Sequence, residues 1–126
     1  MTESQFTQSI MRKLDKRIYK WKIMNMMQNG VPDCYFSGPA GDLWVEFKYI
    51  KVPKRDTTEF KPKLSALQLK WLNERYDEGR NVAVILGSDI GSAIFIDRWW
   101  NGFITWKYLV STKQDIVKWI ETQTLG

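Results

Sequence analysis

Residues 43–50 read LWVEFKYI, an octapeptide with the alternation of a β-strand at the centre of a sheet. Because side chains on a β-strand alternate between its two faces, the odd-numbered residues share one apolar face and the even-numbered residues share the other. The second face carries Glu46 and Lys48, two residues apart, among aromatic and aliphatic neighbours. Buried charges have to be paired or bind a metal, so these two charges on an otherwise apolar strand indicate a functional site.

The residues before this strand carry the turn signals of a β-hairpin. A short β-prone run at residues 34–36 lies between two stretches rich in turn-forming residues, 30–33 and 37–42. Asp33 therefore stands at the mouth of the first arm and Glu46 stands within the second. The chain between them is long enough for two short antiparallel strands and their turn, so we expect the two carboxylates to meet.

Patterns on either side of the hairpin predict a mixed α/β fold. Apolar residues at helical spacing favour helices, and alternating or continuous apolar runs bounded by glycine favour strands. The order contains no internal repeat and no long linker, so we expect a single domain over residues 1–126 with a mixed central β-sheet flanked by helices (α-β-β-β-α-β, then a strand and a helix). The expected elements are a helix at 3–17 that Thr2 or Ser4 caps and that ends in basic residues, a strand at 18–24, the hairpin with arms at 34–36 and 43–50, a basic loop at 51–63, a helix that Ser65 caps and that ends at Gly79, strands at 82–86 and 93–96, and a helix at 112–122.

Composition removes several classes of chemistry. The chain of 126 residues has no histidine and one cysteine, Cys34. The lack of imidazole excludes Ser-His and Cys-His nucleophile pairs and the common histidine-bearing zinc sites, and one thiol forms neither an internal disulfide nor a thiolate zinc site. Any catalysis therefore rests on carboxylates, lysines, hydroxyls or a hard cation held by oxygen.

The formal net charge of +5 suits a polyanionic partner such as nucleic acid. Residues 48–63 concentrate six cations against two acids. A solvated surface loop has the same composition, so the charge run alone does not decide between the two interpretations. As candidate contacts to a phosphate backbone we take Lys51, Lys54, Arg55, Lys61 and Lys63.

Nothing in the sequence predicts export or a membrane partner. No apolar run approaches the roughly 20 residues of a membrane span, and no basic segment followed by an apolar stretch opens the chain. A single cysteine fits a reducing compartment. We therefore expect a cytoplasmic protein of a bacterial or phage-infected cell, with no small-molecule organic cofactor.

Asp33, Glu46 and Lys48 form a set suited to phosphodiester hydrolysis. Mg²⁺ prefers oxygen ligands, is commonly held by one or two carboxylates, and can activate water, neutralise charge and assist the leaving oxygen. Asp33 and Glu46 are the candidate ligands, with the peptide carbonyl of Phe47 as a further one. Lys48 leaves the same strand face as Glu46, so its ammonium can approach the attacking water or the phosphate. Asp42 is a rival second acid, which the spacing of Glu46 and Lys48 disfavours.

These residues resemble the motif of the PD-(D/E)xK nucleases, which have the restriction-endonuclease-like fold. Pro32-Asp33 matches the PD pair, and Glu46-Phe47-Lys48 matches (D/E)xK. The chain is also similar to the VRR-NUC branch, in which a glycine precedes the PD pair and Ser-x-x-Gln-x-x-Trp and a later glycine follow the strand. The matching residues are Gly30, Ser65-Ala66-Leu67-Gln68-Leu69-Lys70-Trp71 and Gly79, and the resemblance covers about residues 3 to 87.

The resemblance implies a restriction-endonuclease-like core and a Mg²⁺- or Mn²⁺-dependent endonuclease. It implies that Gln68 approaches the metal site, although Gln68 also fits a capping box, and the two roles are expected to coexist only if the side chain is not turned back onto the backbone. It implies an additional acid from the first helix, for which Glu3 is best placed. Short stand-alone members of the branch resemble structure-selective DNA endonucleases, so the implied substrate is branched DNA, a four-way (Holliday) junction cut by a homodimer. Phe47 and the long segment 49–63 depart from the family pattern and point to an altered substrate choice.

Two other functions fit the same residues. One is a nicking, flap or RNA-processing nuclease of the same fold, since fold does not determine substrate. The other is a non-catalytic nucleic-acid-binding protein in which Glu46 and Lys48 are only an ion pair. The many aromatic residues suit a dimer interface or a core, and we expect Trp99 and Trp100 to be an exposed pair.

Overall fold

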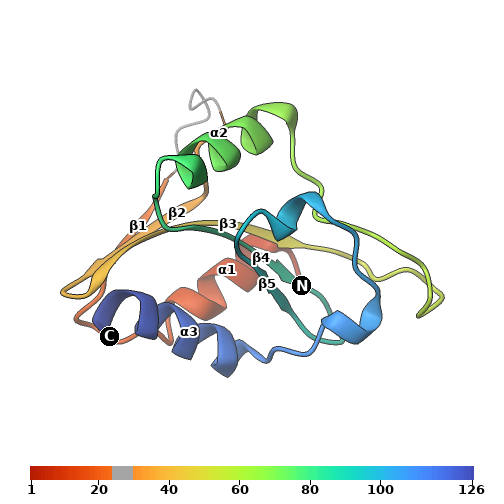
Figure 1. Cartoon of the computed structure of the whole chain (residues 1–126). Coiled ribbons are helices and arrows are strands. Elements are labelled where there is room, and N and C mark those ends of the chain that lie inside the picture. Colours follow the sequence, from red (N-terminus) through yellow and green to blue (C-terminus); the bar gives the residue numbers. More distant parts are fainter. Residues whose placement is uncertain (24–29) are drawn as a thin grey trace.

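A mixed β-sheet organises the chain. The computed structural model describes residues 1–23 and 30–126. Their elements, in chain order, are α1 (Glu3–Met11), β1 (Tyr19–Lys22), β2 (Cys34–Gly38), β3 (Gly41–Tyr49), α2 (Ala66–Asp77), β4 (Val82–Gly87), β5 (Ala93–Phe95), the 3₁₀ helices η1 (Trp99–Asn101) and η2 (Trp106–Tyr108), and α3 (Lys113–Leu125). The strands lie in sequence order across the sheet and run antiparallel to their neighbours, except for the parallel pair β3 and β4 (Figure 1).

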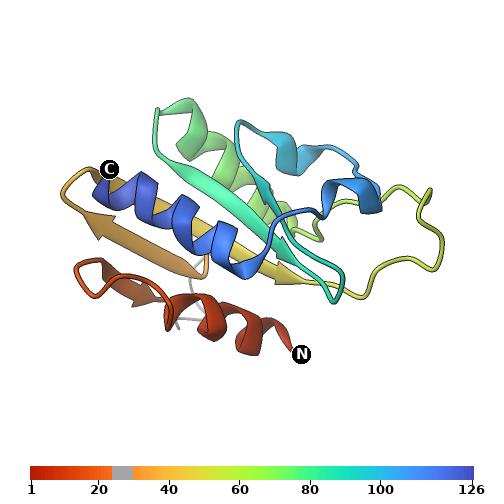
Figure 2. The ribbon, with the colours of Figure 1, turned by 90° about the horizontal axis from the view of Figure 1, so that it is seen from below.

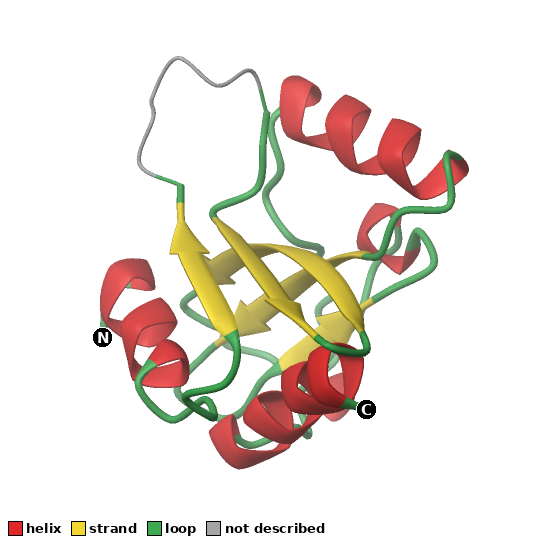
Figure 3. Cartoon of the chain, turned by 90° about the vertical axis from the view of Figure 1, so that its left-hand side faces the viewer, coloured by secondary structure: helices red, strands yellow, loops and turns green. Residues whose placement is uncertain are grey.

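Helices cover both faces of this sheet. Figures 1 and 3 show α2 above the sheet and α1 and α3 below it, and Figure 2, seen from below, shows α3 in front of the sheet and roughly along its strands. The lower face of β3 packs Leu43, Val45 and Phe47 against α1 and α3. The upper face meets α2 through Trp44. The alternation predicted for residues 43–50 is therefore confirmed.

Capping boxes begin the three α-helices of the described residues. The side chains of Thr2, Ser65 and Thr112 each accept a hydrogen bond from the backbone N–H three residues later, and the side chain at that later position accepts one in return. The predicted caps Thr2 and Ser65 are thus confirmed. Helix α2 ends with Glu78 as its C-cap and Gly79 follows at φ +83°, so the predicted C-cap is one residue late. No helix within residues 1–23 and 30–126 is long and apolar enough to cross a bilayer.

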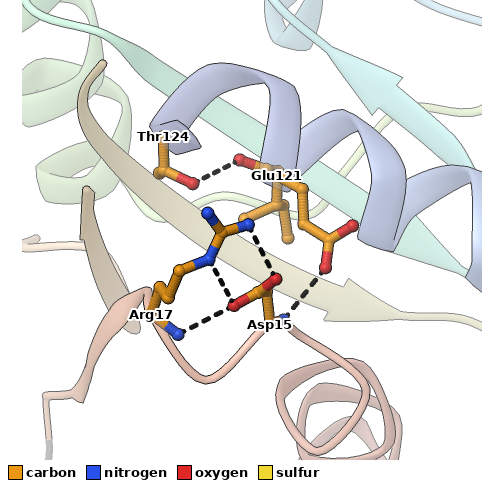
Figure 4. A network of polar contacts seen from close by, with 5 residues as sticks. Asp15, Arg17, Glu121 and Thr124 are labelled. Carbon is orange, nitrogen blue, oxygen red and sulfur yellow. Dashed lines mark hydrogen bonds and ion pairs between the residues drawn. The ribbon is translucent and has the colours of Figure 1, made fainter. Parts of the chain in front are cut away.

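Helix α1 ends at Met11, well before the predicted end at Arg17, and no basic residue lies in its last turn. The chain turns instead because Asp15 has partners outside the helix. Its backbone N–H donates to the Glu121 carboxylate of α3 (2.9 Å), and its own carboxylate accepts from the backbone N–H of Arg17 (2.9 Å) (Figure 4). Leu14 is buried in this turn, which explains why the apolar spacing resembled a longer helix.

The strand predictions hold with small shifts. Strand β1 begins at Tyr19, and the predicted end at Met24 lies outside the described residues. Strand β2 extends to Gly38, so only Pro39 and Ala40 connect it to β3. Strand β4 is buried at every position and pairs with β5, as the two apolar runs predicted. The predicted order of elements is therefore the observed one.

Candidate active site

The hairpin of β2 and β3 brings Asp33 and Glu46 together. Cys34 pairs with Val45, so Asp33 and Glu46 stand at the next pair of positions along the two strands. The backbone N–H of Phe47 donates to Asp33 Oδ2 (3.0 Å) and holds this carboxyl group against β3. Each carboxyl group shifts the pKa of the other: Asp33 raises the pKa of Glu46, and Glu46 lowers the pKa of Asp33. The structure thus places side by side the two acids that the motif singled out.

The Glu46 carboxylate is buried, and one of its oxygens has no partner. Glu46 is only 2% exposed. Its Oε2 lies 3.4 Å from Lys48 Nζ and accepts a hydrogen bond from Gln68 Nε2 (3.2 Å). Its Oε1 is buried and accepts no hydrogen bond from the described residues. Because an unpartnered buried carboxylate oxygen is costly, this atom marks a position that suits a cation.

Burial raises the pKa of both carboxyl groups. The pKa of Glu46 is raised to about 8, first by burial and then by the charge of Asp33, against the opposing effect of Lys48. Burial also raises the pKa of Asp33, against the hydrogen bond from the Phe47 backbone. Two adjacent carboxylates in a largely buried site repel each other, whereas a divalent cation between them favours both ionised forms. This all-oxygen donor set fits Mg²⁺ or Mn²⁺.

Lys48 lies on the same face of β3 as Glu46. Its side chain is 18% exposed, with Nζ held near Glu46 Oε2. The ammonium therefore sits at the border of the site, within reach of an anion that binds beside Glu46. The rival acid Asp42 is exposed and accepts a hydrogen bond from the Ser37 hydroxyl (2.9 Å). Asp42 is thus engaged at the far end of the hairpin, apart from the carboxylate pair.

Gln68 has both of the contacts that its position suggested. Its Oε1 accepts a hydrogen bond from the backbone N–H of Ser65 (2.9 Å) and completes the capping box of α2. Its Nε2 donates to Glu46 Oε2 (3.2 Å). The expectation that a side chain turned back onto the backbone loses the site is therefore wrong. The two ends of a carboxamide bind different partners, so the capping oxygen leaves the nitrogen free to reach Glu46.

The backbone around Gly30, the glycine before the Pro-Asp pair, leaves no room for a side chain. Its φ is +82°, and a Cβ at this position would lie 2.2 Å from the Leu67 carbonyl oxygen. Any side chain would push this segment away from the beginning of α2. Because the segment leads to Asp33 and α2 carries Gln68, the close backbone contact joins the two sides of the site.

Glu3 lies at the exposed beginning of α1, within electrostatic range of the site. Its pKa is raised, first by partial burial, and the charges of Lys48 and Asp33 reach it. Across residues 1–23 and 30–126, no group of three or more acidic or cysteine side chains is arranged to hold a metal ion. The structure therefore brings Glu3 near the pair without making it the third member of an acidic cluster.

The basic loop that follows β3 is exposed beyond the Lys48 end of the strand. Phe60 attaches it to the body of the protein by pairing with Ile104, and the Trp106 indole N–H donates to the Pro53 carbonyl (3.0 Å). This attachment leaves the basic side chains at the surface. The exposed cations of the loop are Lys51, Lys54, Arg55, Lys61 and Lys63.

An aromatic row crosses the upper side of β1, β2 and β3, and the sequence patterns did not reveal it. Trp21 pairs with Tyr35, and Tyr35 pairs with Trp44. The alternation of side chains along a single strand predicts which face of the sheet each of these residues occupies. Their pairing across three strands depends on the register, which the sequence pattern does not specify.

A second aromatic surface surrounds the edge strand β5. Trp99 is 68% exposed, but Trp100 is 1% exposed and its indole N–H donates to Asn73 (3.0 Å), so the predicted exposed pair is half wrong. The reason is that successive residues of a 3₁₀ helix point in different directions. A groove of about 500 Å³ lies here. We call its exposed lining the apolar patch: Ile96, Trp99, Phe103, Tyr108 and Val110.

Comparison with known proteins supports the fold class. No family model matches the chain, and no curated protein matches its sequence. The five-stranded mixed sheet flanked by helices is the restriction-endonuclease-like α/β fold that the sequence predicted. Nine chains of solved structures match it. Among them is the 1.6 Å structure of Archaeoglobus fulgidus Hjc, a Holliday junction resolvase from an archaeal hyperthermophile, with 16% identity, a TM-score of 0.60, and coverage of 90% of this chain and 98% of that one.

Proposed function

We propose that this chain is a metal-dependent DNA endonuclease that hydrolyses phosphodiester bonds in branched DNA. One observation carries the proposal: Glu46 is buried beside a second acid, Asp33, and its Oε1 has no partner among the described residues. Such a pair is unfavourable for folding alone, because each carboxylate loses water and repels the other. A bound cation makes the same arrangement favourable.

Asp33 and Glu46 would hold Mg²⁺ or Mn²⁺, with the Phe47 carbonyl and the Glu3 carboxylate as further oxygen ligands. Bound there, the ion supplies a Lewis acid that lowers the pKa of water and offsets charge on phosphate oxygens. The backbone N–H of Phe47 keeps the Asp33 carboxyl in place. The Gln68 amide holds one oxygen of Glu46 and leaves the other unpartnered. These contacts fix both carboxylates before substrate binds, which lowers the cost of ordering the site.

Lys48 acts on the charge that develops during hydrolysis. As water attacks phosphorus, a new P–O bond forms, the bond to the leaving oxygen breaks, and negative charge increases on the non-bridging oxygens. An ammonium at the border of the site stabilises this charge more in the transition state than in the bound substrate. The contact with Glu46 holds Lys48 in that position.

Branched DNA is the substrate that the fold and the surface favour. One structural neighbour, Archaeoglobus fulgidus Hjc, is described as a Holliday junction resolvase. The described residues form one sheet with its covering helices, and selectivity through backbone geometry requires no separate base-reading module. The five loop cations would bind phosphates, so neutralising them is expected to lower the slope of log affinity against log salt by about 0.9 for each phosphate that they no longer neutralise.

A homodimer would give two active sites for two symmetric strands. The apolar patch supports this part of the proposal, because Trp99, Phe103 and Tyr108 are each more than half exposed and lie around one groove. Contiguous exposed apolar surface of this kind is typical of interfaces. Sedimentation equilibrium of the wild type and of Trp99→Asp tests it. We expect a dimer for the wild type and a monomer for the variant, and a monomeric wild type would contradict the assembly.

The ion pair between Lys48 and Glu46 favours one competing function, a non-catalytic nucleic-acid-binding protein. Their 3.4 Å contact is what a purely structural pair requires. A structural pair does not account for the unpartnered Oε1 or for the second acid, Asp33. We therefore rank the nuclease first and keep nicking, flap and RNA substrates as arms of the test.

The decisive experiment compares substrates with and without metal. Labelled four-way junction, flap, nicked duplex, linear duplex, single-stranded DNA and RNA are incubated with the protein in Mg²⁺, Mn²⁺ or chelator. We expect metal-dependent cleavage that is fastest on the junction, and none by Glu46→Gln. The matched control is Glu74→Gln, which removes an acid from the surface of α2 and should cut normally. Binding without cleavage under every condition would support the non-catalytic alternative.

A further inference from the structure

The aromatic row lies on the same face of the sheet as the carboxylate pair. The rings of Tyr35 and Trp44 lie 4.6 Å apart, and those of Trp44 and Trp71 lie 5.3 Å apart. Trp21 is the cross-strand neighbour of Tyr35 and is 47% exposed. The row thus runs from the exposed edge strand β1 to helix α2.

The row lies directly next to the carboxylate pair. Tyr35 follows by two positions Asp33, which immediately precedes β2, and Trp44 precedes Glu46 by two positions on β3. Residues two apart on a strand share a face and lie about 7 Å apart. The row and the carboxylates are therefore adjacent on one surface, at a separation that a single nucleotide can bridge.

Packing does not account for the exposed half of the row. Trp44 and Trp71 pack against the upper hydrophobic core, whereas Trp21 and Tyr35 belong to neither core cluster of the described residues. Cross-strand aromatic pairs do stabilise a sheet. The exposed side of Trp21 nevertheless faces solvent at the border of a hollow of about 960 Å³, which Tyr35 and Trp44 also line.

The other side chains of this hollow suit a nucleotide. Arg80 borders it with a side chain that is 66% exposed and lies 4.0 Å from the Glu78 carboxylate, and a surface cation of this kind attracts a phosphate. Asn81 and Asp42 also line it, but the Asn81 amide nitrogen donates to the Asp42 backbone carbonyl and to Gln123 Oε1 (both 3.1 Å), and the Asp42 carboxylate accepts from the Ser37 hydroxyl. Stacking, not hydrogen bonding to a base edge, is therefore the contact that the hollow offers to a base. Aromatic faces with a neighbouring cation are the arrangement on which unpaired bases stack, and the bases of continuous duplex are not available for such stacking.

We propose that this hollow binds an unpaired nucleobase of the DNA strand that is cut, stacked against Trp21 and Tyr35, about one nucleotide from the phosphate at Asp33 and Glu46. The inference rests on the proposed nuclease function and names the feature of the substrate that the site selects. A base near a branch point unstacks at lower cost than a base within duplex. The row therefore favours branched DNA through its shape, without reading base identity.

The test uses the full chain and DNA that carries the fluorescent base 2-aminopurine next to the branch point of a four-way junction. The same base in continuous duplex is the reference, and Ca²⁺ replaces Mg²⁺ during binding. We expect the wild type to change the fluorescence of the junction probe and not that of the duplex probe. Trp21→Ala and Tyr35→Ala should abolish the change and weaken junction binding by about 10-fold or more, with little effect on duplex.

Two further variants separate stacking from stability. Trp21→Phe keeps an aromatic face and should retain most of the fluorescence change. Trp119→Ala removes a tryptophan that packs on the opposite face of the sheet and should bind the junction like the wild type. Thermal unfolding of each variant gives its folded fraction under the assay conditions.

The outcomes separate this inference from the nuclease proposal. If the wild type cuts junctions while the probe is unaffected, or if Trp21→Ala loses junction and duplex binding equally, the base site is refuted and the nuclease stands. If the probe responds but no DNA is cut in Mg²⁺ or Mn²⁺, the endonuclease is refuted and the base site stands. If Trp21→Ala and Tyr35→Ala bind and cut like the wild type, the row is only sheet packing.

Discussion

Two acidic clusters of this protein have opposite electrostatics. Asp15 is held by three hydrogen bonds from Arg17, at 2.9, 3.1 and 3.0 Å, and the pKa of Asp15 is lowered to about 2, chiefly by these bonds (Figure 4). Glu46 is buried next to Asp33, has one unpartnered oxygen, and has a pKa raised to about 8. Asp15 stabilises a turn, and its carboxylate has its hydrogen-bond partners within the protein. Glu46 lacks a partner among the described residues for one buried oxygen, so its site requires a ligand from outside the protein, such as a cation.

Removal of either acid from the Asp33 and Glu46 pair should have the strongest effect on function. Asp33→Ala or Glu46→Ala should reduce metal binding and cleavage to background while the protein stays folded, because the remaining carboxylate holds a cation mainly through water. Calorimetric titration with Mn²⁺ and a junction cleavage assay measure the two losses. Asp15→Ala, the matched change in the satisfied cluster, should cut normally. Normal metal binding by either site variant would contradict the assignment.

Replacement of Lys48 should separate the loss of catalysis from the loss of binding. Lys48→Met should reduce single-turnover cleavage by about 10²- to 10⁴-fold, the range for a positioned catalytic group, with little change in affinity for metal or DNA. The metal ligands remain, and the contribution of the ammonium is greatest in the transition state. Cleavage at saturating protein and a gel shift with the same junction measure the two effects. Equal losses in both would make Lys48 a phosphate contact.

Substitution of Gln68 tests a residue that both caps helix α2 and positions Glu46. Gln68→Ala removes the cap contact to Ser65 and the contact to Glu46, whereas Ser65→Ala removes only its own half of the capping box. Both variants should lose about 1 kcal/mol of stability. Only Gln68→Ala should also lose activity, by about 10-fold, the cost of removing a group that orients a metal ligand. Urea unfolding and cleavage rates check this, and equal activities would make Gln68 a cap alone.

The pH dependence of stability is the smallest effect and has opposite signs in the two clusters. The folded pKa of Glu46 lies above its ordinary 4.5, so the metal-free protein should lose stability as pH rises from 4.5 to about 8. The folded pKa of Asp15 lies below its ordinary 3.8, so its contribution should be lost as pH falls from 3.8 to about 2. Thermal unfolding in chelator measures both.

Substitutions assign these two trends to their residues. Glu46→Gln should flatten the decrease above pH 4.5, and Asp15→Asn should flatten the decrease below pH 3.8. Saturating Mn²⁺ should counter the loss at the higher pH, because the ion binds the ionised carboxylates. A decrease above pH 4.5 that survives Glu46→Gln would place its origin outside the site.

Prediction from sequence succeeded where the signal is local. The alternation of residues 43–50 predicted both faces of β3, and Thr2 and Ser65 predicted two helix starts, since strand faces and caps depend on residues a few positions apart. The prediction for α1 failed because Glu121, far along the chain, binds the backbone of Asp15 and supports a turn. Trp100 was misjudged for a similar reason, since Asn73 of α2 receives its indole N–H.

Local sequence patterns were enough to predict the order of the main helices and strands and the presence of an acid pair and a lysine on one hairpin, because each follows from periodicity, turn residues and spacing within one segment. The tertiary structure alone decided that Gln68 reaches Glu46 while it caps α2, and that Trp21, Tyr35 and Trp44 form one row. These facts depend on strand register and on the approach of a helix to a sheet. Both are determined by packing among residues distant in sequence, which no local pattern records.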